Sequence, residues 1–349
     1  MIHLRSSVLK GALRPKSAQD LWPVLQHAVE LEHSTIPVYL YALYSLNASA
    51  NAEIAAIIQS VVVEEMLHMT LASNLLNALG GSPAIDRPGF IPKYPGPLPG
   101  GIQGELTVHL APFSMKQVDT FLQIEEPEDP IKFQSLTATK GLPDEITIGQ
   151  FYLSILAGIE SLGDGAFVKP PRNQVGPEIM PESVEVFDVR TAKTAITTII
   201  DQGEGTRKSP LEVVGAGYAH YYRYMQIKKG RLLVRHPNPK LPPNQQYSYT
   251  GAPLPFNHSG VYAVPTDPSS ANYPQGSAQA AANDNFNYTY TSLLSALQAM
   301  VNGVNTEDQF RRAIGLMMSL KEQAIAMMAG ITNSKLFIGP SFEYLRVNP

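Results

Sequence analysis

The feature that most constrains this chain is a pair of ionisable residues on the apolar face of an expected helix. The segment from about residue 52 to 79 carries apolar residues at alternating steps of four and three, which places them on one helical face. Glu65 and His68 occupy two positions of that stripe. Burying an ionisable side chain without a partner is strongly unfavourable. The fold must therefore supply a counter-charge, a hydrogen-bond network or a metal ion at this point.

A second helix, expected at about residues 17–47, directs another carboxylate inward. Glu32 lies on its apolar stripe. Pro37 follows within the same segment and cannot donate a hydrogen bond to the carbonyl of His33. We therefore expect a kink or bulge one turn after Glu32, which would open space beside its carboxylate.

Two later segments add one more polar residue each. A helix expected over about 189–204 ends with Glu204, and one expected over about 210–229 directs His220 inward. If His220 closed a second Glu-x-x-His motif, its register would require a carboxylate where the chain has Gly217. The set is thus one residue short of a dinuclear carboxylate bundle, and a mononuclear or asymmetric site stays open.

Composition limits the chemistry of such a site. The chain has no cysteine, so disulfides, thiolate metal sites and cysteine nucleophiles are excluded. Carboxylate oxygens combined with imidazole nitrogens suit iron, with manganese as the second choice. The net charge of -4 without a basic run argues against nucleic acid and membrane surfaces as partners. With no apolar stretch of about 18 residues, we expect a cytoplasmic protein whose partner is a small-molecule substrate.

We expect one mainly α domain over residues 1–349, built on a four-helix bundle core with long irregular insertions. Apolar periodicity of helical type is interrupted twice by segments rich in Pro, Gly, Asn and Ser. The expected parts are a helical core at about 17–80 and 147–230, an insertion at 81–146, an irregular wrap at 231–282 and a C-terminal helical pair at 286–330.

A buried network of Glu and His ion pairs is the main alternative to a metal site. Glu64 and Glu160 are interpreted as flanking residues, although either could take part if its helix were rotated by a fraction of a turn. The clustered tyrosines near residues 39–44 and 218–224 are interpreted mainly as packing.

Several motifs along the chain carry a specific resemblance when they are taken together. They are Leu31-Glu-His-Ser-Thr-Ile-Pro-Val-Tyr-Leu-Tyr-Ala-Leu-Tyr44, Glu64-Glu-Met-Leu-His68, Tyr94-Pro-Gly-Pro-Leu-Pro-Gly100, Ile148-Gly-Gln-Phe-Tyr152, Gln202-Gly-Glu-Gly205, His220-Tyr-Tyr-Arg-Tyr224 and Gly339-Pro-Ser-Phe-Glu-Tyr344. The chain resembles the ferritin-like family that includes the iminophenyl-pyruvate dimer synthase of violacein biosynthesis. Gln150 and Gly217 depart from the pattern, which often carries Glu there.

The resemblance implies a ferritin-like four-helix core, to which the chain adds the two C-terminal helices expected from its periodicity, and a carboxylate and histidine metal site. That site maps onto Glu32, Glu65, His68, Glu204 and His220. The favoured function is a metal-dependent oxidoreductase of secondary metabolism that holds one or two iron ions. It would oxidise a small, amino-acid-derived or aromatic molecule with dioxygen or peroxide.

Two other functions remain as alternatives. One is a non-catalytic structural or binding protein with a degenerate metal site, and the other is a haem-dependent oxidative enzyme acting through an axial histidine. The sequence assigns no catalytic residue and leaves a homo-oligomer open.

Overall fold

The structure is a computed structural model, and its helices form a mainly α fold. It describes residues 3–101, 106–127, 145–204, 210, 217–238, 240–241, 245–304, 306–330 and 338–345, with the side chain of residue 204 left out. The α-helices within this part are α1 (Trp22–Tyr44), α2 (Ala52–Ala78), α3 (Met115–Ile124), α4 (Ile148–Leu162), α5 (Val189–Glu204), α6 (His220–Lys229), α7 (Ala278–Val301) and α8 (Glu307–Ala329).

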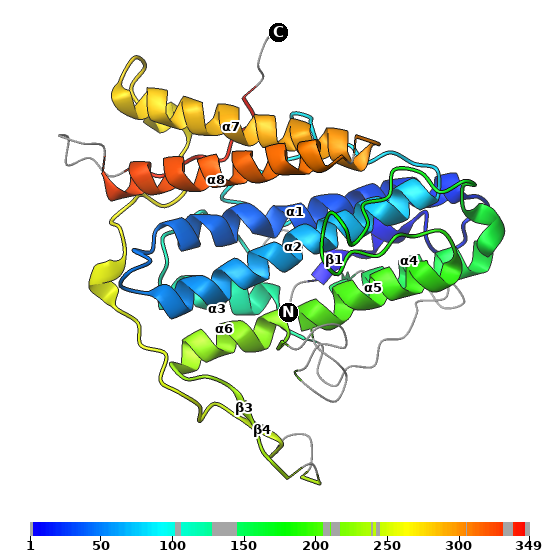
Figure 1. The fold of residues 1–349 in the computed structure, drawn as a ribbon, viewed down its shortest axis with the longest axis horizontal. Coiled ribbons are helices and arrows are strands. Elements are labelled where there is room, and N and C mark those ends of the chain that lie inside the picture. The colour runs from blue at the N-terminus through cyan, green and yellow to red at the C-terminus, as the bar shows by residue number, and fades with distance from the viewer. Residues whose placement is uncertain are drawn as a thin grey trace.

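The helices form three layers (Figure 1). The hairpin of α1 and α2 occupies the middle layer, and α7 and α8 pack together on one side of it, contacting α2 and α1 respectively. The shorter helices α3 to α6 cover the other side, where α5 and α6 contact α2, α4 packs on α5, and α3 packs on α6.

The residues before α1 carry a recognisable helix-start signal. Ser17 and Asp20 form a capping box on a short 3-10 turn, Ala18–Leu21, which leads directly into the helix. The chain is then buried at every position from Leu31 to Leu46, because α1 has neighbours on both faces. Pro37 lies inside this buried stretch, and the helix continues past it to Tyr44.

The central helix α2 is long and apolar enough to cross a membrane by length and composition alone. In the described fold it contacts α1, α5, α6 and α7, so its apolar surface is used in the core of the bundle. A core helix passes the same test of length and composition as a membrane span. The cytoplasmic location stays a prediction.

Two short antiparallel pairs are the named strands in the described residues. β1 (His3–Arg5) pairs with β2 (Glu145–Thr147), and β3 (Val234–Arg235) pairs with β4 (Tyr247–Ser248). The first pair fixes the start of α4, because β2 leads straight into its N-cap at Thr147. There Gln150, a position where the resembling family often has Glu, closes a capping box with Thr147 at 3.1 and 3.2 Å.

The structure differs from the sequence analysis at two helices. The predicted insertion at 81–146 contains α3, whose N-cap Ser114 accepts a hydrogen bond from the backbone of Gln117. Of the predicted helix over 210–229, residues 211–216 lie outside the described residues, and α6 begins at His220 because Ala219 before it has an extended backbone (ψ 157°) that cannot continue a helix. The register argument about Gly217 therefore fails, since that residue lies outside the helix.

Candidate metal centre

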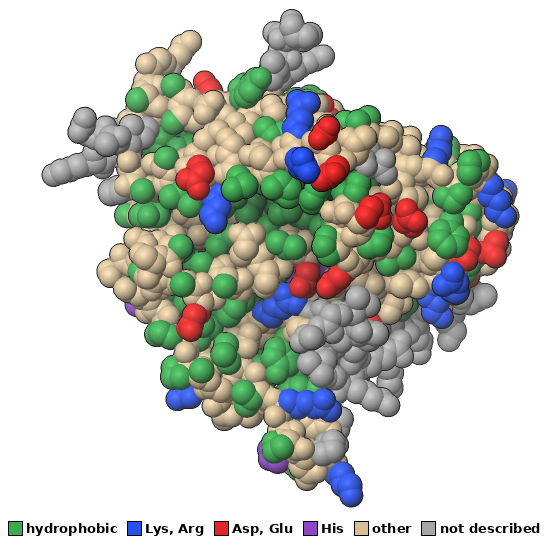
Figure 2. Space-filling model, in the orientation of Figure 1, with side chains coloured by type: hydrophobic (Ala, Val, Ile, Leu, Met, Phe, Trp, Pro, Cys, Tyr) green, Lys and Arg blue, Asp and Glu red, His purple; other side chains and the backbone are tan. Residues whose placement is uncertain are grey.

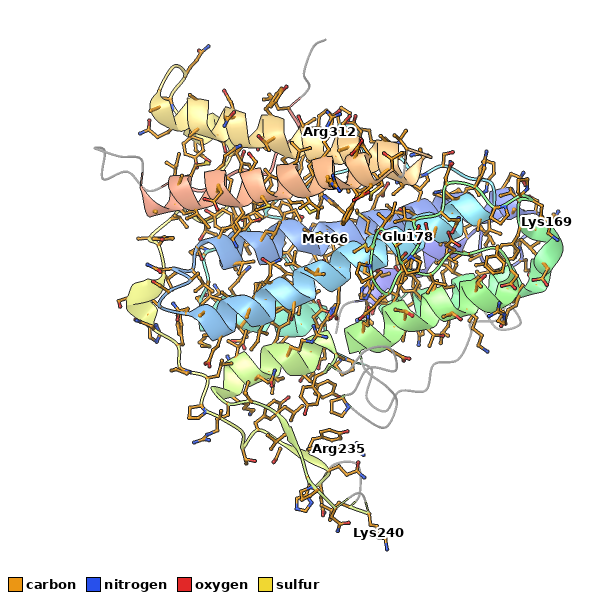
Figure 3. All side chains as sticks on the ribbon, viewed as in Figure 1. Met66, Lys169, Glu178, Arg235, Lys240 and Arg312 are labelled. Carbon is orange, nitrogen blue, oxygen red and sulfur yellow. The ribbon has the colours of Figure 1, made fainter. Side chains whose placement is uncertain are left out.

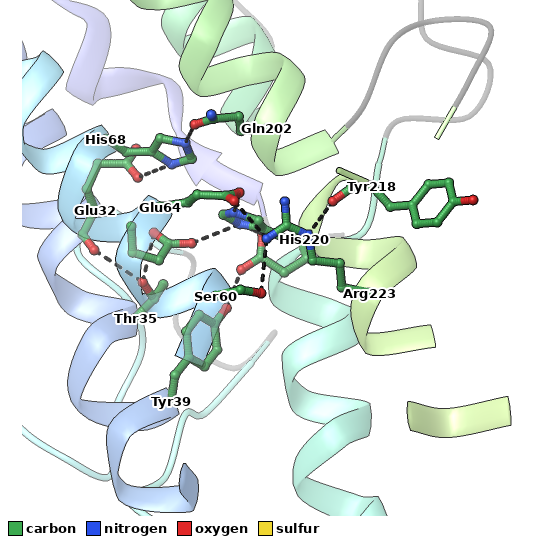
Figure 4. A network of polar contacts seen from close by, with 12 residues as sticks. Glu32, Thr35, Tyr39, Ser60, Glu64, His68, Gln202, Tyr218, His220 and Arg223 are labelled. Atoms are coloured by element: carbon green, nitrogen blue, oxygen red, sulfur yellow. Dashed lines mark hydrogen bonds and ion pairs between the residues drawn. The ribbon is translucent and has the colours of Figure 1, made fainter. Parts of the chain in front are cut away.

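The candidate metal centre lies where the short helices end and begin. The last turn of α3, the first turns of α4 and α6, and the last turn of α5 line one cavity of about 60 Å³ against the faces of α1 and α2. Figure 4 shows the polar side chains that meet there. The helix breaks thus bring polar groups from six helices to one point.

One half of the centre is built around His68. Its Nδ1 lies 3.5 Å from Oε2 of Glu32, whose other oxygen accepts a hydrogen bond from the hydroxyl of Tyr152. Its Nε2 lies 2.9 Å from Oε1 of Gln202, and Nε2 of Gln202 donates to Glu182 at 3.0 Å.

This chain of contacts fixes which nitrogen of His68 carries a proton. A carboxylate such as Glu182 accepts hydrogen bonds, so the amide nitrogen of Gln202 must face it and the amide oxygen must face His68. His68 therefore donates from Nε2, which leaves the lone pair of Nδ1 directed toward the carboxylates in the neutral ring. A hydrogen bond of this kind on the outer nitrogen is the usual support of a metal-binding histidine.

The other half repeats this arrangement around His220, which is fully buried. Its Nε2 donates to Glu64 at 2.9 Å, and Arg223 holds the other oxygen of Glu64 at 2.7 Å. Its Nδ1 lies 3.1 Å from Glu65 and 3.4 Å from Glu125, yet makes no hydrogen bond of acceptable geometry with the described residues. Glu64 is therefore a positioning residue, which corrects its interpretation as a flanking side chain.

The centre concentrates negative charge in a buried place. Burial and the neighbouring carboxylate of Glu125 raise the pKa of Glu65 to about 7. Burial alone would lower the pKa of His220, but Glu125, Glu64 and Glu65 together hold it well above its usual value. Burial likewise opposes the charge on His68, and Glu32 raises its pKa overall. Without a cation, the cluster must bind protons to offset its own charge.

The buried carboxylates and imidazoles fit a metal ion. Two groups of side chains each offer ligand atoms within 4.8 Å of one another, and Glu65 belongs to both. The first group is Glu32, Glu65 and His68, and the second is Glu65, Glu125 and His220. The Nδ1 of His220 faces the carboxylates of Glu65 and Glu125, and a cation bound between these three groups could take the place of the proton.

Comparison with known proteins identifies the fold. The Ferritin-like family model matches residues 25–229 of the 349. The chain belongs to the Ferritin-like family. Among solved structures, it is similar to the crystal structure of a ferritin like protein from Caulobacter vibrioides, with 26% identity, a TM-score of 0.64, and coverage of 93% of this chain and 97% of that chain. Among proteins with curated descriptions, none matches this chain.

The predicted ferritin-like, mainly α fold is thus confirmed. Of the five predicted ligands in this Ferritin-like chain, the structure brings together Glu32, Glu65, His68 and His220. Glu204 forms the end of α5, but its side chain lies outside the described residues.

Sequence reasoning missed Glu125, which follows α3 and is 8% exposed. The hydroxyl of Tyr39 donates a hydrogen bond to it. A signal was present, because Val118, Phe121 and Glu125 follow one another at helical steps of three and four. The surrounding Pro-rich and Gly-rich sequence obscured it.

Proposed function

We propose that the protein is a metal-dependent oxidoreductase that binds iron at this centre and oxidises a small molecule with dioxygen or peroxide. The observation that carries the proposal is the matched orientation of His68 and His220, whose inner nitrogens both face carboxylates. Glu32, Glu65 and Glu125 supply the oxygen ligands, and Glu204 remains a proposed ligand from the sequence. Because Glu65 belongs to both groups, the arrangement favours two ions.

The chemistry of the ligands supports iron over other metals, with manganese as the second choice. Hard carboxylate oxygens with imidazole nitrogens, and no thiolate, are the donor set that these ions use in helical bundles. When bound, iron supplies redox chemistry that neither carboxylates nor imidazoles possess.

The chain's own residues would hold the ligands in place and exclude water. Tyr152 and Tyr39 each donate a hydrogen bond to a carboxylate of the centre, which fixes the orientation of Glu32 and Glu125. Thr35 does the same for Glu65 at 3.1 Å. Apolar side chains complete the wall of the cavity, namely Leu31, Leu98, Ile124, Ile148, Ile199 and Ile200.

The substrate class is the finer part of the proposal. The resemblance to the family of the iminophenyl-pyruvate dimer synthase supports an amino-acid-derived or aromatic substrate. The comparisons that identify the fold carry only the Ferritin-like assignment, and function resides in the site and not in the fold.

The test is metal content combined with oxygen consumption. Protein is purified, reconstituted with Fe(II) without oxygen, desalted, and analysed by elemental analysis and in an oxygen electrode. We expect about two iron ions per chain, as in dinuclear bundles, and oxygen uptake on aeration. His68→Ala and His220→Ala should lose most of the iron while retaining the helical circular dichroism signal.

His109→Ala is the matched control, because this half-exposed histidine pairs with Asp267 away from the centre. Its iron content should equal that of the unaltered protein. Full iron retention in both the His68→Ala and His220→Ala variants would overturn the proposal.

A buried ion-pair network is the second candidate, and the close contacts between both histidines and glutamates favour it. In that case the protein would be a structural or binding bundle. It predicts no iron after reconstitution. An optical spectrum of the purified protein tests the haem alternative, which would show an intense Soret band.

A further inference from the structure

A second, much larger cavity lies on the side of α1 and α2 that faces away from the candidate metal centre. It has a volume of about 550 Å³ and is enclosed between α1 and α2 on one side and α7 and α8 on the other. Figure 2 shows it as a hollow with apolar walls between α8 and α2. Its volume falls within the usual range for sites that bind small organic molecules.

The walls are apolar and rich in methionine. Six methionines line the cavity, contributed by α2, α7, α8 and the segment before α5: Met66, Met69, Met180, Met300, Met317 and Met318. Met66 lies between α2 and α8 in Figure 3. Methionine side chains adapt to the shape of a ligand, and their sulfur atoms make favourable contacts with aromatic rings.

The mouth of this cavity exposes apolar side chains to solvent. Val63 is 49% exposed, Ile314 38% and Met318 64%, and all three line the cavity. Exposed apolar side chains that continue into an apolar cavity mark a binding site more often than isolated ones do.

The charged residues of the cavity argue against an anionic ligand. Glu64, Glu182 and Lys321 line it. Glu64 pairs with Arg223 and His220, whereas Glu182 accepts a hydrogen bond from Gln202. Arg223 offsets the charge of Glu64, which leaves the carboxylate of Glu182 against the exposed ammonium group of Lys321. The lining therefore has no net positive charge that would favour a ligand carboxylate.

We propose that this cavity binds an uncharged aromatic molecule of two or three rings. Its volume, its methionine-rich walls and the lack of a net positive charge in its lining agree on that class of ligand and disfavour fatty acids. Among the described residues none lines both cavities, and Glu64 and Glu182 connect the two through their contacts with His220 and Gln202.

The experiment uses N-phenyl-1-naphthylamine, a neutral probe that fluoresces in apolar surroundings, titrated into both metal-free and iron-reconstituted protein. We expect saturable binding of one probe molecule per chain in both forms, displaced by naphthalene. Leu297→Trp fills the cavity from α7 and should weaken binding at least tenfold. Leu232→Trp is the control, because Leu232 is 38% exposed and lies outside the cavity.

If Leu297→Trp does not fold, the pair Ile314→Gln and Met318→Gln tests the same cavity through its exposed mouth, and probe affinity should fall several-fold. Four results would overturn the proposal. The first is the absence of saturable binding, and the second is equal probe affinity in the unaltered protein and the cavity variants. The third is displacement of the probe by dodecanoate at a lower concentration than by naphthalene. The fourth is a dimer in sedimentation analysis that dissociates when Ile314→Gln and Met318→Gln are combined. Because probe binding is measured in protein with and without iron, a failure of the proposed metal site would not by itself change the result for this cavity.

Discussion

Two hydrogen-bond relays determine what the residues of the candidate centre can do. Gln202 is itself held by Glu182, and Glu64 by Arg223, so each presents an acceptor to the outer nitrogen of a histidine. The inner nitrogens of both rings are then available for a cation. The relays thus set which nitrogen of each ring faces the carboxylates, and a metal ion would displace the proton that the raised pKa values of His68 and His220 favour there.

At the same scale, we expect Glu125→Gln to lower the iron content of reconstituted protein from about two ions to about one per chain. Glu125 belongs to one of the two ligand groups, and the other keeps all its carboxylates. Elemental analysis measures the change. Glu160→Gln, an exposed substitution on α4, is the control and should leave the content unchanged. An unchanged iron content in Glu125→Gln would remove this residue from the proposed ligands.

Asp201 provides a prediction of pH dependence. Burial raises its pKa from 3.8 to about 6. Between those pH values the folded protein binds more protons here than the unfolded chain, so this carboxyl group lowers the free energy of unfolding as pH rises from 3.8 to 6.

Asp201→Asn should therefore raise the free energy of unfolding at pH 7, by no more than about 1 kcal/mol because the group is partly hydrated. Urea unfolding at pH 4 and pH 7 measures it, and the gain should be smaller at pH 4. A gain of equal size at both values would contradict the assigned pKa.

The residues of the centre could be predicted only where they interrupt a regular pattern. Glu32, Glu65 and His68 stand out because they occupy apolar positions on long helices. Glu125 follows a helix of ten residues, too short to display its pattern clearly. The relays through Gln202 and Glu64 could not be predicted, because they join segments more than 130 residues apart in the sequence.

At the scale of elements, the breaks between the short helices position the ligand candidates as much as the helices do. α3 ends beside Glu125 and α6 begins at His220, so each break places a ligand candidate at a helix end. Sequence periodicity predicted the long helices, because a stripe over six or more turns is unambiguous. It carried the helix of α6 backward past Ala219, since nothing in the pattern marks the extended backbone there.

Two glycines at different positions of their helices give opposite predictions. Gly230 ends α6 with φ of 63°, a left-handed conformation that an alanine side chain disfavours. Gly315 lies within α8, exposed, with no atom close to the place of an added Cβ.

We therefore expect Gly230→Ala to lower the free energy of unfolding by about 1 to 2 kcal/mol, and Gly315→Ala to raise it by about 0.5 to 1 kcal/mol. Chemical denaturation measures both. The same sign of change in the two variants would contradict the assigned backbone conformations.

At the scale of the whole molecule, residues 338–345 pack back onto the outer layer of helices. Residues 338–345 lie against α7, where Asn283 accepts a hydrogen bond from the backbone of Ser341 at 2.9 Å. Asn287 donates to the Ser341 hydroxyl at 2.8 Å and accepts from the backbone of Glu343 at 3.0 Å. These buried amides hold residues 338–345 on the outer layer.

Asn287→Ala should lower the free energy of unfolding by about 2 to 3 kcal/mol, because it leaves buried polar groups without partners. Limited proteolysis should also cleave the C-terminal segment faster. Asn285→Ala, at an exposed position of the same helix, should change stability by less than about 0.5 kcal/mol. If the two variants are equally stable, the segment is held by other contacts.

The continuous burial of Leu31 to Leu46 has a consequence for how the protein can change. A helix with one solvent-facing side tolerates many amino-acid replacements on that side. The stretch from Leu31 to Leu46 has no solvent-facing side. In a saturation mutagenesis library it should form the longest run of intolerant positions among the described residues. Useful diversity, whether from evolution or from engineering, must then arise mainly in the outer layers that flank it.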